Sequence, residues 1–179
     1  MTQTHSFKRV RPDGCITLVG MAGSGKTTVG KALAAKLDWV QVDVDHVIEA
    51  AYGTRLQDVA DSMSKEEFLD VEADIVCKLN VQRTVLSPGG SAVYRQRAVD
   101  HLRSLGPIVF LDVPTPTIVY RISLNPERGL AIAPGQTIED LIAERALMYD
   151  AAADFHLNAD GLNPEQCAQA IVDWLSTAP

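Results

Sequence analysis

The strongest constraint on this chain is the glycine-rich segment Gly20-Met-Ala-Gly-Ser-Gly-Lys-Thr27, which follows the apolar run Cys15–Val19. It fits the pattern G-x-x-x-x-G-K-[ST], which wraps backbone N–H groups around phosphates when it joins a strand to a helix. The predicted helix would add its positive N-terminal end to the site. Lys26 is expected to contact the β- and γ-phosphate oxygens, and the Thr27 hydroxyl to bind Mg²⁺. The predicted nucleotide-binding residues of this segment are Gly23, Ser24, Gly25, Lys26, Thr27 and Thr28.

Other nucleotide-binding classes fit the sequence less well. The glycines at 20, 23 and 25 do not form the G-x-G-x-x-G spacing of dinucleotide-binding folds, so a nucleoside triphosphate is favoured over NAD. The Asn/Thr-Lys-x-Asp element with which a GTPase reads guanine does not occur in the sequence. A length of 179 residues is also short for a motor ATPase.

Composition narrows the possible partners and the setting. The 179 residues, 46% of them hydrophobic, predict one domain over 1–179, with residues 1–13 as a flexible arm. Sixteen Lys plus Arg against 23 Asp plus Glu give a net charge of −7, which argues against nucleic acid and anionic membranes as partners. The three cysteines have no CxxC spacing, and no apolar run approaches the roughly 18 residues of a membrane span. We therefore expect a cytoplasmic monomer that acts on a small molecule.

The order of apolar and amphipathic segments predicts an α/β domain. Short apolar runs alternate with longer segments of helical periodicity, which is typical of a parallel sheet covered by helices in three layers. The predicted strands, each apolar enough to be buried on both faces, are Cys15–Val19, Trp39–Asp43, Thr84–Ser87, Ile108–Asp112 and Phe155–Ala159. The predicted helices are Lys26–Leu37, Lys65–Leu79, Arg95–Leu105, Thr115–Leu124, Thr137–Ala152 and Pro164–Leu175. Residues 125–135 hold two Pro and two Gly and are predicted to form a mobile lid.

Polar residues follow two of the predicted strands. Alternation along the second strand would place Asp43 and Asp45 on one face at its carboxyl end, where open α/β sheets bind ligands. One carboxylate could hold hydrated Mg²⁺ and the other could deprotonate an attacking hydroxyl; alternatively, Asp45 could simply cap a helix over His46–Ala51. After the third strand, Gly89 and Gly90 would allow a small molecule to approach the backbone closely, with Ser91 as a hydrogen-bonding group, although a tight turn without a ligand fits the same residues.

Taken together, these features resemble a shikimate kinase over about Ile16–Leu175. The resemblance lies in the glycine-rich segment, the Asp43/Asp45 pair, Phe68 and Glu72 on the following helix, the Gly89-Gly90 turn, Arg128 in the predicted lid and Arg145-Ala-Leu-Met-Tyr149. It implies a P-loop kinase fold like that of the nucleoside monophosphate kinases, with a five-stranded parallel sheet in the order 2-3-1-4-5. It also implies that ATP and Mg²⁺ are used to phosphorylate a hydroxyl of a small carboxylate metabolite in amino-acid biosynthesis.

The same resemblance suggests roles for individual residues. Lys26 and Arg128 would neutralise charge on the transferring phosphoryl group, and Asp45 would bind and orient the acceptor hydroxyl. Lys26, Asp45 and Arg128 are therefore the predicted catalytic residues. Thr27 and Asp43 would hold the metal. Arg121, Asn163 and Pro164 fall where the family binds adenine, although Asn-Pro is equally a helix-start signal. The predicted acceptor-binding residues are Asp45, Leu69, Gly89, Gly90, Ser91 and Arg145.

Two positions depart from the family pattern, and both lie in the acceptor pocket. The family has an Arg directly after the Phe of this helix, where this chain has Leu69, and a third glycine where this chain has Ser91. Loss of one charge-assisted hydrogen bond, about 1.5–3 kcal/mol, would weaken shikimate binding roughly ten- to a hundredfold. Because Asp70 and Glu72 then have less positive charge nearby, we favour an acceptor with an added ammonium group, a hydroxy amino acid such as homoserine. The alternatives are shikimate itself, with a relocated cation such as Arg55, and a non-catalytic ATP-binding module.

Overall fold

The structure is a computed structural model that describes residues 8–124, 130, 132, 133 and 135–177. Its strands form one parallel sheet in the order β2-β3-β1-β4-β5. This confirms the predicted fold class and strand order. The strands are β1 (Cys15–Val19), β2 (Val40–Asp43), β3 (Thr84–Ser87), β4 (Ile108–Asp112) and β5 (Phe155–Asn158).

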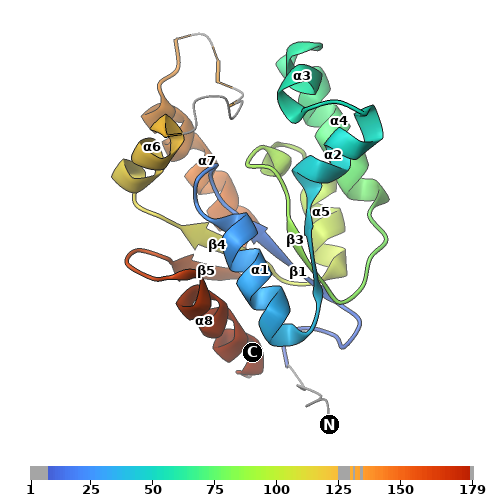
Figure 1. Ribbon diagram of the computed structural model, residues 1–179, viewed down its shortest axis with the longest axis vertical. Helices are drawn as coiled ribbons and strands as arrows, with labels where there is room; N and C mark the ends of the chain where they lie inside the picture. Colours follow the sequence, from blue (N-terminus) through green and yellow to red (C-terminus); the bar gives the residue numbers. More distant parts are fainter. Residues whose placement is uncertain (1–7, 125–129, 131, 134, 178–179) are drawn as a thin grey trace.

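Helices connect the strands and cover both faces of the sheet, with α1 and α8 in contact on one side (Figure 1). Three of them, α4, α7 and α8, begin with complete capping boxes, in which the first and fourth residues satisfy each other's backbone N–H groups. The helices are α1 (Lys26–Leu37), α2 (Val44–Tyr52), α3 (Leu56–Asp61), α4 (Lys65–Lys78), η1 (Ala92–Tyr94), α5 (Gln96–Leu105), α6 (Thr115–Ser123), α7 (Ile138–Ala152) and α8 (Pro164–Ser176).

Alternate residues of the central strands point into two separate hydrophobic cores. On β1, Ile16 and Leu18 pack with α1 and α8, whereas Cys15 and Val19 pack on the opposite face with α4, α5 and α7. Because both faces are covered, β1 and most of β4 are fully buried. The carboxyl ends of the parallel strands are thereby held at one edge of a rigid sheet, where the predicted site residues lie.

Several expectations need correction. The edge strands β2 and β5 are not buried on both faces, and Val40 is 62% exposed, because each has only one neighbouring strand. Helix α3 was not predicted. In the described part of the expected N-terminal arm, Val10 is buried in the core with α1 and α8, and the Lys8 N–H donates to Leu175 O, so these residues are packed against α8.

The predicted lid is largely outside the described residues. Of 125–135, the structure describes residues 130, 132, 133 and 135, and Leu130 and Ile132 pack against the core that contains α7. Arg128 is outside the described residues, so its predicted catalytic role remains a prediction. In the described parts of the chain, no helix is long and apolar enough to cross a lipid bilayer.

Candidate active site

The glycine-rich segment forms the turn between β1 and α1, as predicted. Gly25, the residue before α1, has a left-handed backbone with φ of 94°, a conformation that glycine adopts without strain. The Lys26 ammonium lies across the turn and donates to Gly20 O at 2.7 Å and Met21 O at 3.0 Å. The buried Ser24 hydroxyl has no hydrogen-bond partner within the described ranges. A buried hydroxyl without a hydrogen-bond partner, in a glycine-rich turn at the start of a helix, fits a site where a bound ligand supplies that partner.

The predicted metal ligands lie together. Thr27 Oγ1 donates to Asp43 Oδ2 at 2.8 Å, which brings a hydroxyl and a carboxylate to the first turn of α1. Such oxygen ligands suit Mg²⁺, which keeps several waters and takes others from substrate phosphates. Among the described residues there is no cluster of three or more His, Cys, Asp or Glu that could hold a metal by itself. The chain's own contribution therefore fits Mg²⁺ delivered with a nucleotide.

Asp45 occupies a different element from the one predicted. The strand ends at Asp43, and Asp45 lies in the first turn of α2. Asp43 is also the residue that caps this helix, because its Oδ1 accepts from the Asp45 N–H at 3.1 Å. The alternative in which Asp45 was the cap is therefore wrong. Asp45 Oδ1 instead faces Gly89, and it would lie 3.0 Å from a Cβ atom at that residue.

The Gly89-Gly90 turn faces charged groups from three helices. A Cβ on Gly89 would overlap Glu72 Oε1 from α4, and a Cβ on Gly90 would lie 3.1 Å from Arg145 Nη1 of α7. Since neither glycine has a positive φ, the reason for glycine here is space rather than backbone conformation. The turn thus brings Asp45, Glu72 and Arg145 together around its two glycines, where the acceptor pocket is predicted.

Glu72 is the buried carboxyl of this pocket. It is 1% exposed, and Ser91 Oγ donates to its Oε2 at 2.6 Å. Burial raises the pKa of Glu72 to about 7, against the lowering effect of the Ser91 hydrogen bond and with a further rise from the nearby Asp45 charge. The two residues that depart from the family pattern are therefore both next to Glu72, since Ser91 binds it and the buried Leu69 precedes it by one helical turn.

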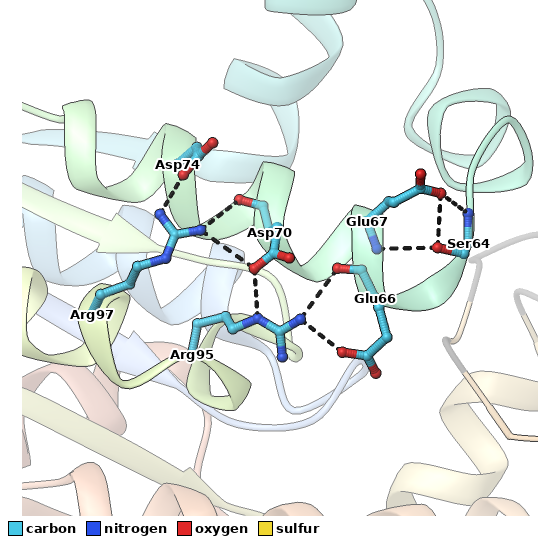
Figure 2. A network of polar contacts seen from close by, with 7 residues as sticks. All are labelled: Ser64, Glu66, Glu67, Asp70, Asp74, Arg95 and Arg97. Atoms are coloured by element: carbon cyan, nitrogen blue, oxygen red, sulfur yellow. Dashed lines mark hydrogen bonds and ion pairs between the residues drawn. The ribbon is translucent and has the colours of Figure 1, made fainter.

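Asp70 points away from this pocket. Arg95 Nε donates to Asp70 Oδ1 at 2.7 Å, and Arg97 reaches the same oxygen at 3.4 Å, in an exposed network between α4 and α5 (Figure 2). The guanidinium of Arg95 holds the pKa of Asp70 below its usual range. The sequence does not decide whether Asp70 faces the acceptor pocket; the structure pairs it with Arg95 and Arg97, so the charge argument depends on Glu72 alone.

The residues predicted to bind adenine, and the cation Arg55, lie outside the cluster of Asp45, Glu72 and Arg145. Arg121 on α6 adjoins the glycine-rich turn, where its Nη1 donates to Gly23 O at 2.9 Å. Asn163 caps α8 by accepting from the Gln166 N–H, with Pro164 in its first turn, so the structure assigns these two residues a helix-start role. Arg55 is exposed and paired with Asp58, which gives no support to a cation relocated into the pocket.

Three polar residues of the site were absent from the predicted set. Glu72 enters the sequence argument only as part of the resemblance and as a charge that favours an ammonium group, and its burial against Ser91 depends on a segment 19 residues later. Tyr149 connects the two halves of the site, because its hydroxyl donates to Gly90 O at 2.6 Å and lies 3.7 Å from Met21 Sδ. Tyr94, whose hydroxyl accepts from Arg145 Nε, had no signal in the sequence because its partners are distant along the chain.

A cavity of about 220 Å³ adjoins the glycine-rich turn. It lies between that turn, the carboxyl end of β4 and helices α6 and α7, and Met21, Ser24, Asp112 and Tyr149 are among its lining residues. Ser24, whose buried hydroxyl has no hydrogen-bond partner in the described part of the chain, is thus one of the residues that line this cavity.

The sequence matches a family model and several curated relatives that carry the same name. The family model described as shikimate kinase matches residues 22–176. Shikimate kinase of Thermodesulfovibrio yellowstonii is 33% identical over 160 residues, which cover 88% of this chain and 92% of the relative. Shikimate kinase of Corynebacterium diphtheriae is 33% identical over 171 residues, which cover 94% of this chain and 97% of that protein.

A solved structure of a shikimate kinase also has the same fold as this chain. Shikimate kinase from Acinetobacter baumannii in complex with shikimate superposes with a TM-score of 0.83 at 28% identity, covering 90% of this chain and 92% of that one.

Proposed function

Because the chain belongs to the shikimate kinase family, whose members are kinases that use ATP with Mg²⁺, we propose that it phosphorylates a hydroxy amino acid such as homoserine. The observation that carries the proposal is the pocket of Asp45, Glu72 and Arg145, which adjoins a phosphate-binding turn and has Leu69 in place of an arginine.

The nucleotide half of the site supplies charge neutralisation. Phosphoryl transfer spreads negative charge over the equatorial oxygens, so catalysis depends mostly on positioning and on cations. Lys26 would leave its backbone acceptors in the turn and donate to the β- and γ-phosphates. Thr27 and Asp43 would hold Mg²⁺, which when bound neutralises phosphate charge.

The acceptor half supplies a base and a carboxylate anchor. Asp45 would accept the proton of the attacking hydroxyl, which needs hydrogen-bond contact between the two oxygens. Arg145 is 2% exposed and its Nη2 has no partner among the described residues, so a ligand carboxylate would satisfy a buried donor.

Glu72 is the residue that favours an ammonium group on the acceptor. A pocket with two carboxylates and one arginine suits a zwitterion better than an acid of net charge −1, because the second carboxylate can pair with the ammonium. Leu69 adds no charge that would oppose this pairing.

Shikimate is the second candidate, and the relatives support it. The proteins compared above are named shikimate kinase, and one of them is solved with shikimate bound. A non-catalytic ATP-binding module is the third reading; the presence of Asp45 beside the pocket speaks against it, since nucleotide binding alone requires no such base.

A coupled ADP assay with MgATP separates these readings. We expect turnover with L-homoserine, weaker turnover with shikimate, and little ADP release without acceptor. Efficient turnover of shikimate at submillimolar concentration, with none of homoserine, would overturn the amino-acid proposal and leave a shikimate kinase. Absence of turnover with any of a panel of hydroxy acids, despite ATP binding, would support the non-catalytic reading.

Substitution of Leu69 tests the pocket directly. Leu69→Arg restores the family's charge beside Glu72, and we expect the KM for shikimate to fall roughly tenfold while the KM for homoserine rises. Leu69→Met is the matched control, since it keeps an apolar side chain of similar volume. A melting temperature should accompany both variants. No change in either KM for a folded Leu69→Arg protein would contradict the assigned position of this residue.

The raised pKa of Glu72 predicts a pH dependence. Below pH 7 the carboxyl is mostly protonated, and above it the carboxylate can pair with an ammonium group. The kcat/KM for homoserine should therefore rise about tenfold from about pH 6 to about pH 8. Glu72→Gln, which can still accept from Ser91, should flatten this profile. An unchanged profile in Glu72→Gln would assign the titration to another group.

A further inference from the structure

Tyr94 lies at the centre of a hydrogen-bonded chain that ends on Arg145. It is the last residue of η1, directly after the Gly89–Ser91 turn. Its hydroxyl donates to Glu144 Oε1 at 2.6 Å and accepts from Arg145 Nε at 3.3 Å. These directions are fixed by chemistry, because arginine can only donate and a carboxylate can only accept. The phenol therefore has a single orientation between the two side chains.

Further contacts fix the members of this chain. Glu144 Oε2 accepts from Gln136 Nε2 at 2.7 Å, so both carboxylate oxygens are occupied. The Arg145 Cζ atom lies 5.3 Å from the centre of the Tyr94 ring, within the range of a cation–π interaction. Burial and the Glu144 hydrogen bond both raise the pKa of the Tyr94 phenol, which keeps it protonated and able to donate.

The contacts leave one nitrogen of the buried Arg145 guanidinium without a hydrogen-bond partner among the described residues. Its Nε is engaged by Tyr94, whereas Nη1 lies beside Gly90 and Nη2 has no hydrogen-bond partner in the described part of the chain. A guanidinium binds a carboxylate with two parallel N–H groups, and its orientation determines whether both can be used. The side chain is buried, so the contact with Tyr94 is made without competition from bulk water.

We infer that Tyr94 and Glu144 are positioning residues that orient Arg145 to bind the acceptor carboxylate. This rests on the proposed function, which places that carboxylate on Arg145. The position after Phe68, where the family pattern has a second arginine, holds Leu69 in this chain. An arginine that is oriented by the Tyr94 phenol, itself oriented by Glu144, loses less conformational freedom on binding, which offsets part of the missing contact.

The Tyr94→Phe variant keeps the ring and removes both hydrogen bonds of the hydroxyl. We expect the KM for the acceptor, homoserine or shikimate, to rise about five- to tenfold, with the KM for ATP and kcat within about twofold of the parent. Glu144→Leu should give the same split, and Glu144→Gln, which still accepts from the phenol, should restore the parent value. Combining Tyr94→Phe with Glu144→Leu should add little, because both break one chain. Tyr52→Phe, an exposed tyrosine at the end of α2, is the matched control.

A second measurement needs no acceptor. The Arg145 Nε–H resonance of ¹⁵N-labelled protein, assigned by its loss in Arg145→Lys, should move or broaden in Tyr94→Phe and stay unchanged in Tyr52→Phe. An unchanged resonance in Tyr94→Phe would overturn the inference, as would equal increases in the KM values for ATP and acceptor. If the parent enzyme phosphorylates neither acceptor while the resonance moves as expected, the positioning of Arg145 stands and the proposed acceptor fails.

Discussion

Replacing Lys26 by Ala should lower kcat by roughly 10²- to 10³-fold. That is the typical effect of removing one group that stabilises the charge of a transition state, and Lys26 is the only cation of the glycine-rich turn. Stability should fall only slightly, because the loss of the two Lys26 hydrogen bonds is partly offset by removal of a positive charge that opposes the dipole of α1. The coupled ADP assay and a thermal melt measure the two effects.

Lys31→Ala is the control for this variant, since it removes an exposed lysine from the same helix. It should keep full activity and a similar melting temperature. A Lys26→Ala enzyme with a normal kcat would show that the turn binds nucleotide without contributing to transfer.

Asp45→Asn should lower kcat by about 10²- to 10⁴-fold, the range for loss of a general base. Asn has almost the same shape, so the acceptor can still enter, and its KM should change far less than kcat. The effect should be confined to the chemical step, with the KM for ATP close to the parent value. Steady-state kinetics with both substrates varied give the required separation.

The control is Asp58→Asn, an aspartate in the first turn of a helix remote from the pocket, α3. Asp45 likewise lies in a first turn, so both variants lose a similar interaction with a helix dipole. A near-normal rate in Asp45→Asn would remove this residue from the proton-transfer step.

The sheet and the phosphate-binding turn were predictable because their signals are local. Buried parallel strands are short apolar runs, and the turn is a fixed spacing of glycines between a strand and a helix. Helix α3 is hard to predict because it has six residues and the residue before it, Arg55, makes no capping hydrogen bond with its side chain. Asp45 was assigned to a strand because alternation was extended two residues too far, past the capping residue Asp43.

The orientation of the acceptor-pocket residues was not predictable in the same way. Helical periodicity puts Asp70 and Glu72 on different faces of α4 but does not say which face is the pocket. Arg95 and Arg97, some 25 residues later, pair with Asp70, while Ser91 binds Glu72. These partners come from another segment, and only the packing of η1 and α5 on α4 brings them there.

The carboxylate of Asp43 joins the two halves of the site. One oxygen accepts from Thr27 and the other holds the first turn of α2, which carries Asp45. Any order that a bound nucleotide imposes on Asp43 would therefore reach the first turn of α2, which carries Asp45, through this side chain. Thermodynamic linkage requires the reverse as well: an acceptor that steadies Asp45 must tighten nucleotide binding by the same factor. We therefore expect nucleotide and acceptor each to tighten the binding of the other.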